Sequence, residues 1–368
     1  MPTERATERP TDSPRPATLR IDLDSLAHNF RFLRDRAAPA DCSAVVKADA
    51  YGLGVERVVR RLLREGCRRF FVATAAEARE LRTLAREAEI AVFEGALPTT
   101  VDTLVELDAR PVLNTLEQVE RWRGKGRALL HLDTGMNRLG LSRADVAALA
   151  ARQDWLDELA LDFVMTHLAC ADEPAHPMNA EQLARFERMR RSLPSAGTSI
   201  GNSAGTLIDA AHCGDLVRPG IGLYGGNPFS DRPNPMKNVV TLTAPILQLR
   251  EIGEPQPVGY GATYVANPPA RLAVVGIGYA DGYPRSLGNA GSAAVNGRRV
   301  PVVGRVSMDL ICVDVGALRR DEVRVGDPVE LIGAIVGLDE VAATAGTISY
   351  EILTGMGRRL ARAYVESR

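Results

Sequence analysis

Several features that would assign the chain to a specialised class of protein are missing from its sequence. No apolar run approaches the roughly 18 residues that a membrane-spanning helix requires. The formal net charge is only -1, which removes any bulk electrostatic attraction to nucleic acid or to an anionic membrane. We therefore expect neither nucleic acid nor a membrane among the partners of this 368-residue chain, whose composition is that of an ordinary globular protein.

Cysteine is scarce, and no Cys-x-x-Cys pair occurs. The five cysteines are widely spaced, at Cys42, Cys67, Cys170, Cys213 and Cys312. This pattern favours reduced, mostly buried thiols over a disulfide framework or a structural zinc. One group of metal-binding residue types lies close together in the sequence: His167, Cys170, Asp172 and His176. Zinc requires a tighter and closed ligand set, so we expect no metal site.

The first sixteen residues are rich in proline, threonine and arginine and lack the apolar core of a signal peptide. We expect residues 1–16 to be a disordered tail and the protein to be cytoplasmic.

From about Thr18 to Gly225, short apolar runs alternate with amphipathic helical stretches. Residues 19–23 predict a strand, and Ser25 predicts the cap of a helix that ends near Ala37. Later strands are predicted at residues 43–46, 70–73, 90–95, 111–113, 128–133, 163–168, 198–201 and 215–224. About eight strand–helix units in roughly 210 residues favour a (β/α)8 barrel. A doubly wound sheet would call for a Gly-x-Gly-x-x-Gly turn after its first strand, and none occurs there.

The sequence changes character after Asn227, where proline and glycine become frequent and helical periodicity fades. Short apolar runs dominate this part, at residues 239–243, 272–277, 300–303 and 329–332. The predicted fold class is therefore α/β: a (β/α)8 TIM-like barrel over residues 17–235, followed by a mainly β C-terminal domain over residues 236–368.

Lys47 follows a short apolar strand, at the end where barrel strands present catalytic groups. A lysine there is costly to bury in its charged form, but it is useful if the amine is neutral or forms a Schiff base. On position alone, a lysine that extends to solvent is the simpler interpretation.

Five ordered segments reverse that interpretation. They are residues 44–54 (AVVKADAYGLG), 133–140 (DTGMNRLG), 166–169 (THLA), 218–221 (RPGI) and 278–282 (GYADG). Together they resemble the alanine racemases, a pyridoxal-phosphate-dependent family with a barrel and a β domain. The resemblance covers essentially everything from Thr18 to Ala363.

The resemblance implies a catalytic role for each of four residues. Lys47 would carry pyridoxal 5'-phosphate as an internal aldimine and, once freed, would take the proton from the D-enantiomer. The pyridine ring would supply the electron sink that acidifies the α-hydrogen. Tyr279 would take the proton from the L-enantiomer on the opposite face, with His167 and Arg218 as the network that lowers the pKa of its phenol.

Arg218 resembles the arginine that faces the pyridine nitrogen in this family. Because arginine does not give up its proton, the ring nitrogen would stay unprotonated and side reactions such as transamination would be suppressed. The decarboxylases that share this architecture place an acidic residue there, so Arg218 favours a racemase.

The resemblance also implies how phosphate and substrate are bound. Backbone N–H groups of Gly220 and Ile221 would hold the phosphate. Three hydroxyl groups would complete that set, from Tyr51, Ser203 and Tyr350. Arg138 would bind the substrate carboxylate, for which a guanidinium is well suited. Met308 would line the substrate side, and a small pocket crowded by Met308 and Tyr279 would favour alanine.

Two positions depart from the family pattern. His131 stands where well-known members have a carbamylated lysine that supports the substrate-binding arginine. We expect either His131 to act as a neutral acceptor for Arg138 or an ordered anion to take the place of the carbamate. Ser199 replaces a histidine that bonds the pyridine-facing arginine in many members, so the support of Arg218 is changed.

The sequence thus predicts an alanine racemase that supplies D-alanine for the cell wall, working as a homodimer with active sites shared between chains. A racemase of broader specificity, or one for serine, is the alternative enzyme. A non-catalytic protein that carries the cofactor is a third possibility, although such proteins are typically a lone barrel.

Four arginines of one predicted helix are interpreted as a solvated face: Arg185, Arg188, Arg190 and Arg191.

Overall fold

The computed structural model describes residues 17–367, which form two compact units. The barrel unit comprises Ile21–Val240, Ile348–Gly355 and the residues from Tyr364 onward. The β unit comprises the residues up to Arg20, Thr241–Thr347 and Met356–Ala363. The tail predicted over residues 1–16 lies outside the described residues.

A parallel sheet forms the centre of the barrel unit, with the strand order β2-β10-β9-β8-β7-β6-β5-β4-β3. Its two end strands, β2 (Asp41–Cys42) and β3 (Ala44–Val45), are separated only by Ser43, so the sheet closes on itself through one segment. The predicted (β/α)8 barrel is confirmed. The other strands are β4 (Arg69–Val72), β5 (Glu89–Val92), β6 (Arg110–Leu113), β7 (Arg127–His131), β8 (Ala160–Met165), β9 (Gly197–Ser199) and β10 (Leu216–Val217).

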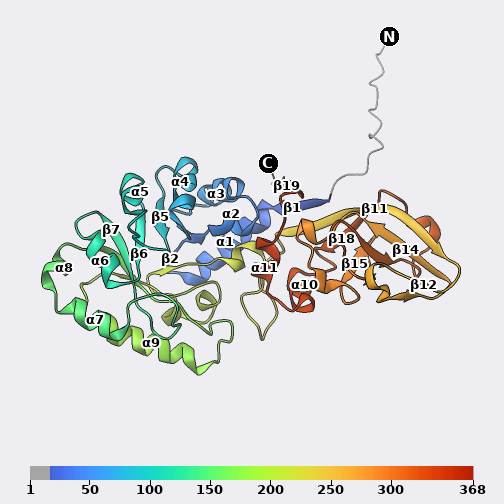
Figure 1. Ribbon diagram of the computed structural model, residues 1–368. Helices are drawn as coiled ribbons and strands as arrows, with labels where there is room; N and C mark the ends of the chain where they lie inside the picture. Colours follow the sequence, from blue (N-terminus) through green and yellow to red (C-terminus); the bar gives the residue numbers. More distant parts are fainter. Residues whose placement is uncertain (1–16, 368) are drawn as a thin grey trace, which may run out of the picture. The chain divides into compact units, whose positions relative to one another are not determined.

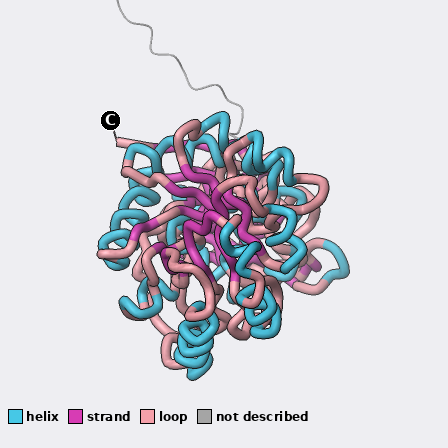
Figure 2. Tube along the Cα trace, turned by 90° about the vertical axis from the view of Figure 1, so that its left-hand side faces the viewer, coloured by secondary structure: helices cyan, strands magenta, loops and turns pink. Residues whose placement is uncertain are grey.

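The strands β4, β5 and β6 each end in three consecutive buried residues. Burial on both faces is expected where a parallel sheet is covered by helices, which explains why these strands appear in the sequence as continuous apolar runs. Figure 2 shows helices around this central group of strands.

The barrel helices follow the predicted strand–helix alternation. Their bounds are α1 (Leu23–Ala37), α2 (Lys47–Tyr51), α3 (Val55–Arg64), α4 (Ala75–Leu84), α5 (Val101–Glu106), α6 (Leu116–Trp122), α7 (Arg143–Ala150), α8 (Gln153–Asp157), α9 (Pro177–Arg190) and α11 (Ser349–Thr354). The predicted cap of α1 was wrong: the side chain of Asp22, not Ser25, accepts from the backbone N–H groups of Asp24 and Ser25. The helix therefore begins earlier than predicted.

The β unit contains an antiparallel sheet with the order β14-β17-β16-β15-β18-β11-β1-β19. Several of its strands, among them β11, β14, β15 and β18, are labelled in Figure 1. The long strand β11 (Val240–Ile252) pairs with β18 through its first half and with β14 through its second half. The remaining strands are β1 (Thr18–Asp22), β12 (Gln256–Pro257), β13 (Val265–Ala266), β14 (Ala270–Val275), β15 (Ser292–Val295), β16 (Arg298–Val303), β17 (Ile311–Asp314), β18 (Pro328–Ile332) and β19 (Ala361–Val365). One helix, α10 (Leu338–Ala345), also belongs to this unit.

Two segments differ from their predicted placement. The strand predicted at residues 19–23 was counted with the barrel, but β1 pairs in the antiparallel sheet between β11 and β19. Conversely, Ile348–Gly355 was assigned to the β domain and instead belongs to the barrel unit. The second difference matters for function because this segment carries Tyr350.

Candidate active site

Lys47 is separated from β3 by a single residue and lies at the carboxyl end of the barrel strands. The four residues that follow it, Ala48–Tyr51, all have left-handed backbone angles, with φ between 53° and 57°. Non-glycine residues in this region cost roughly 1–2 kcal/mol each, so the turn persists only where its surroundings hold it. Two carboxylates do so: Glu77 accepts from the Ala48 N–H at 2.7 Å, and Asp49 accepts from the Val55 N–H at 2.7 Å.

The amine of Lys47 is partly buried, and its Nζ atom lies 5.6 Å from the centre of the Phe93 ring. Burial lowers the pKa of Lys47, and the positive charge of Arg138 lowers it further, against a smaller opposing effect of Glu77. A lysine in this environment has more neutral amine near neutral pH than an exposed one. That is the form needed for a nucleophile or a base.

Three tyrosines gather beside this turn. The ring of Tyr51 lies 4.6 Å from that of Tyr224 and 5.9 Å from that of Tyr350, measured between centroids. Tyr224 donates its hydroxyl to the Val45 carbonyl at 2.8 Å, which ties the cluster to the strand that carries Lys47. Burial raises the pKa of Tyr51, so its hydroxyl remains a hydrogen-bond donor.

The hydroxyl of Tyr51 points at the turn after β10. A Cβ atom built on Gly220 would lie 2.2 Å from the Tyr51 Oη, so only glycine fits there. The buried Ser203 Oγ accepts from the backbone N–H groups of Gly220 and Gly222, at 2.9 and 3.1 Å. Donor groups that converge on one oxygen in this way form a site that also suits a phosphate. Ile221 lies between these glycines, at the start of the short helix η3 (Ile221–Tyr224).

Arg218 is fully buried, and the three hydrogen-bond acceptors found for its guanidinium are neutral. Nη1 donates to the Ser199 Oγ at 2.5 Å, and Nη2 donates to the carbonyls of Thr166 and Ile200 at 2.7 and 3.2 Å. Ser199 in turn donates its hydroxyl to the Leu216 carbonyl at 2.7 Å, which leaves its lone pairs free to accept from Arg218.

Burial lowers the pKa of Arg218 to about 9. The side chain therefore stays charged at neutral pH. Ser199, one of the two positions that depart from the family pattern, supports it by accepting a hydrogen bond.

Arg138 is held in a closed loop between β7 and α7. The Asp133 carboxylate accepts from the N–H groups of Gly135, Met136 and Asn137 at 2.9 to 3.1 Å. Backbone hydrogen bonds between His131 and Leu141 and between Asp133 and Leu141 close the loop. The charge of Arg138 lies close enough to lower the pKa values of Lys47, His131 and His167.

His131 ends β7 and is buried beside Asn114, which follows β6. Its Nδ1 atom lies 2.8 Å from the Asn114 Oδ1. The Asn114 Nδ2 donates to the carbonyls of Phe93 and Val112 at 2.9 and 2.8 Å, so the amide oxygen must face the histidine and accept. Nδ1 of a neutral His131 therefore carries the proton, and Nε2 is left as an acceptor. Burial and the charge of Arg218 lower the pKa of His131 to about 4, so the ring is neutral at physiological pH.

His167 is also held neutral, because burial and the charges of Arg218 and Arg138 keep its pKa well below the usual range. It can offer hydrogen bonds to a neighbouring group but not a positive charge. Of the two residues predicted to lower the pKa of Tyr279, only Arg218 can therefore act through charge.

Tyr279 and Met308 lie together in the β unit. The Tyr279 N–H donates to the Ser307 carbonyl at 3.0 Å, and the Ala280 N–H donates to the Met308 carbonyl at 3.0 Å. A Cβ atom on Gly278 would lie 2.3 Å from the Met308 carbonyl oxygen, so glycine permits this close approach. Tyr279 and Met308 are 43% and 52% exposed, so this adjacent pair is accessible from solvent.

The loops that carry this pair are joined by charged groups that sequence reasoning did not single out. Arg359 forms ion pairs with Asp281 at 3.1 Å and with Asp309 at 2.7 Å. Asp281 also accepts from the Gly278 N–H at 2.9 Å. Asn114 and Tyr224 were missed as well. For Asn114 a signal existed, since neighbouring parallel strands bring residues at their carboxyl ends together.

The structure thus brings the predicted residues into two groups. The barrel group contains Lys47, Tyr51, Arg138, His167, Ser203, Arg218, Gly220, Ile221 and Tyr350, and the β-unit group contains Tyr279 and Met308. Within residues 17–367, no cluster of three or more histidine, cysteine or acidic side chains could hold a metal ion. His176 instead caps α9, where its Nδ1 accepts from the Met178 N–H. No helix in the described part of the chain is long and apolar enough to cross a membrane.

Comparison with known proteins gives consistent matches over nearly the whole chain. The family model for the alanine racemase N-terminal domain matches residues 21–228, and that for the alanine racemase C-terminal domain matches residues 239–364. An alanine racemase of Methylobacterium sp. (strain 4-46) is 45% identical over 361 residues, covering 96% of this chain and 99% of the relative. A catabolic alanine racemase of Agrobacterium fabrum is 45% identical over 356 residues, covering 95% of this chain and 92% of the relative.

Among solved structures, alanine racemase from Bartonella henselae with covalently bound pyridoxal phosphate superposes with a TM-score of 0.92. It is 38% identical, and the match covers 96% of this chain and 100% of the other.

Proposed function

The chain belongs to the alanine racemase family, and we propose that it interconverts L-alanine and D-alanine with pyridoxal 5'-phosphate as its cofactor. The observation that carries this proposal is the barrel group itself. A partly buried amine of lowered pKa, at Lys47, shares the carboxyl end of one barrel with the buried Arg218 and a converging set of phosphate donors. These are the groups that a phosphate-bearing aldehyde cofactor requires.

The residues present fit that cofactor at both of its ends. The Gly220 turn, which a Cβ atom would obstruct, presents N–H groups beside the hydroxyls of Ser203 and Tyr51, and these would hold the phosphate with Ile221 and Tyr350. Arg218 would face the ring nitrogen, and Lys47 would hold the cofactor covalently through its amine. When bound, the cofactor supplies an electron sink that acidifies the α-hydrogen of an attached amino acid.

Lys47 and Tyr279 are proposed as the two acid–base groups. The environment of Lys47 favours a neutral amine, which accepts a proton at Nζ from the D-enantiomer. Tyr279 Oη would accept the proton from the L-enantiomer. Because Arg218 keeps its charge while His167 is neutral, Arg218 supplies the electrostatic stabilisation of the phenolate.

Arg138 would bind the substrate carboxylate, with its guanidinium supported by His131. The hydrogen bond to Asn114 leaves the His131 Nε2 as an acceptor, which is the role that a donor-only guanidinium needs in its partner. The side chain of Met308, beside Tyr279, would limit the substrate to small side chains, favouring alanine over serine or lysine.

Lys47 and Tyr279 belong to different units of the chain, and we propose that the active site is completed in a homodimer. The barrel group of one chain would meet Tyr279 and Met308 of its partner, so each dimer would contain two shared sites. The exposed pair in the β unit supports this arrangement, because both side chains are open to solvent in the single chain and so accessible to a partner.

The cellular role follows from the direction of flux. We propose that the enzyme acts in the cytoplasm and supplies D-alanine for peptidoglycan. One of the similar proteins is called catabolic, so the opposite direction is the alternative role. Deletion of the gene separates them: a requirement for added D-alanine supports synthesis, whereas failure to grow on alanine as a carbon source supports catabolism.

The activity is tested by purifying the protein with pyridoxal 5'-phosphate, recording its visible absorbance, and following racemisation of L- and D-alanine, serine and lysine by polarimetry. We expect an absorbing holoenzyme with the highest kcat/KM for alanine. Lys47→Ala should lose both the covalent absorbance band and racemisation. A wild-type protein that stays colourless after reconstitution would overturn the proposal.

A further inference from the structure

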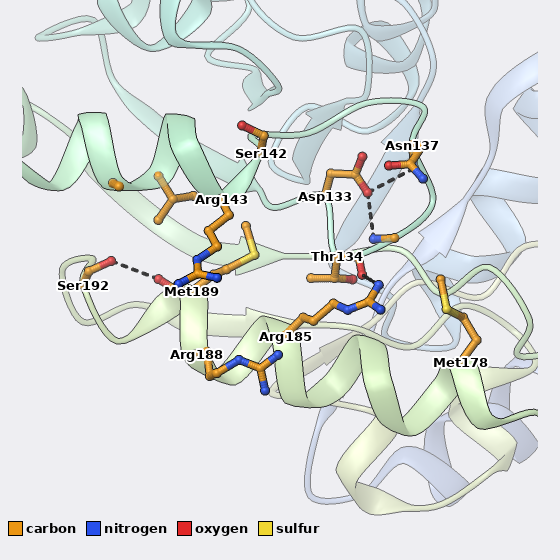
Figure 3. A pocket seen from close by; sticks show the side chains of 13 residues that line it. Asp133, Thr134, Asn137, Ser142, Arg143, Met178, Arg185, Arg188, Met189 and Ser192 are labelled. Atoms are coloured by element: carbon orange, nitrogen blue, oxygen red, sulfur yellow. Dashed lines mark hydrogen bonds between the residues drawn. The ribbon is translucent and has the colours of Figure 1, made fainter.

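A pocket of about 590 Å³ opens in the barrel unit between α7, α9 and the segment Asp133–Asn137 (Figure 3). None of the described residues assigned above to cofactor or substrate lines it. Its volume lies within the roughly 300–1,000 Å³ that small-molecule sites occupy. The pocket is therefore large enough for an organic molecule and distinct from the proposed active site.

Arginine side chains from both helices line this pocket. Arg143 extends from α7 toward α9, which carries Arg185 and Arg188 (Figure 3). Arg185 is already engaged: it donates to the Thr134 carbonyl at 3.0 Å and pairs with Glu181 at 2.7 Å. Within residues 17–367, no ion pair or hydrogen bond of the Arg143 or Arg188 guanidinium is found. Two cationic groups are thus available to a ligand, and the sequence-based interpretation of a merely solvated helix face is incomplete.

The single carboxylate in the lining, that of Asp133, offsets only part of the charge of the three arginines, so the lining stays cationic. Asp133 directs its Oδ1 at three backbone N–H groups of its own loop, Gly135, Met136 and Asn137. The remaining lining includes apolar side chains, among them Val146, Met178 and Met189. Guanidinium groups favour carboxylate and phosphate, and thioethers pack well against apolar and aromatic groups.

We propose that this pocket binds a small organic anion, a carboxylate or phosphate attached to a compact apolar body, and that its occupancy alters the binding of substrate by Arg138. The second part rests on the role given to Arg138 in the proposed function. The first part does not, because it depends only on the charge and shape of the pocket.

Coupling is expected because the pocket wall and the Arg138 loop are the same segment. Asn137, which precedes Arg138, lines the pocket in a left-handed conformation with φ of 54°. Gly135 packs so closely on α9 that a Cβ atom would lie 2.5 Å from the Met178 Cε. An occupant that contacts Asn137 or Met178 therefore presses on the segment that positions Arg138.

A hydrogen-bonded path continues from the wall to the buried arginine of the active site. Gln182 of α9 donates to the Thr134 Oγ1 at 3.1 Å, and this hydroxyl lies 2.7 Å from the Thr166 Oγ1. The Thr166 carbonyl accepts from Arg218 at 2.7 Å. A displacement of Thr134 would therefore reach both the loop of Arg138 and, through Thr166, the hydrogen bonds of Arg218.

The test is calorimetric titration of the holoenzyme with phenyl phosphate, benzoate and neutral benzamide at constant ionic strength. We expect both anions to bind and benzamide not to bind. Arg188→Ala should weaken binding of the anions about tenfold, the loss of one charge-assisted contact. The matched control is Arg191→Ala, which removes the same charge just beyond α9 from a residue outside the pocket lining.

Further variants distinguish the possible failures. Binding should survive in Arg138→Ala, which excludes capture of the anion by the substrate site. Equal weakening in Arg188→Ala and Arg191→Ala, or loss of binding in Arg138→Ala, would overturn the pocket assignment. The coupling is read as a change in KM for alanine on saturation with phenyl phosphate, abolished by Arg188→Ala. If the enzyme is active and its KM does not change, the proposed coupling is overturned. If the enzyme has no racemase activity, the proposed function is overturned, and the calorimetry still tests anion binding in the pocket.

Discussion

Replacing His131 should make the stability of the barrel less sensitive to acid. Burial, followed by the charge of Arg218, lowers the pKa of His131 from 6.5 to about 4 in the folded protein. As the pH falls below 6.5, the unfolded chain binds a proton at this side chain and the folded chain does not. The stability is therefore fully present above pH 6.5 and is lost as the pH falls toward 4.

The expected size of the effect follows from this difference in pKa. Each unit of pKa shift corresponds to about 1.4 kcal/mol, and between pH 7.5 and pH 5 the two titration curves predict a loss of about 2 kcal/mol attributable to His131. The variant His131→Gln lacks this titration, so the free energy of unfolding of the wild type should fall by about 2 kcal/mol more than that of the variant over the same range.

Urea unfolding followed by tryptophan fluorescence provides the measurement. Both tryptophans, Trp122 and Trp155, lie in the barrel unit, so the signal reports on the unit that contains His131. His167, whose pKa is lowered in the same direction, is present in both proteins, and burial and the two arginines, which the variant keeps, are the larger causes of its shift. Equal acid sensitivity of the two proteins would refute the claim that the barrel holds His131 neutral. Nitrogen NMR of the labelled imidazole should also report a proton on Nδ1, as the hydrogen bond to Asn114 requires.

Three further predictions concern the site itself. Mixing Lys47→Ala with Tyr279→Phe, each of which alone should have at most about a hundredth of wild-type activity, should restore about a quarter of that activity if the dimer shares its sites. Half of the dimers are then mixed, and each mixed dimer has one intact site. No recovery would indicate sites within one chain. Gly220→Ala should displace Tyr51 and so weaken cofactor binding at least tenfold, measured by absorbance titration. The control is Gly253→Ala, because a Cβ atom at Gly253 would meet nothing within 4 Å. Tyr279→Phe should slow racemisation by about 10²–10⁴-fold. In D₂O the Tyr279→Phe variant should still exchange the α-hydrogen of D-alanine through Lys47. Equal loss of exchange from D- and L-alanine would contradict the assignment of Lys47 to the D-enantiomer and Tyr279 to the L-enantiomer.

The architecture could be predicted from the sequence because strand periodicity and helical amphipathicity are local properties. The pairing of strands is not local. Residues 19–23 have the pattern of a barrel strand, yet β1 pairs with β11 and β19 of the other sheet. The short helix α11 carries Tyr350, whose ring partner Tyr51 lies about 300 residues earlier in the chain, and no local pattern indicates that contact.

The chemical types at the site could be predicted from the five motifs, but their electrostatic state could not. His167 was expected to help lower the pKa of Tyr279, and only the structure indicates that burial beside two arginines leaves it neutral. The same holds for Ser199, whose ability to support Arg218 depends on its own hydroxyl being donated to the Leu216 carbonyl. Protonation and hydrogen-bond direction arise from neighbours that are distant in sequence.

The positive charge of the barrel group explains why it would bind an anionic cofactor and substrate. Arg138 and Arg218 bring positive charge to the carboxyl end of the barrel. Burial first, and these charges second, lower the pKa values of His131 and His167 and keep both rings neutral. The acceptors found for the Arg218 guanidinium within residues 17–367 are all neutral. A buried cation without an anionic partner is costly, and an anion bound near Arg218 would reduce that cost. We therefore expect the uncompensated charge of Arg218 to contribute part of the energy that would bind an anionic cofactor.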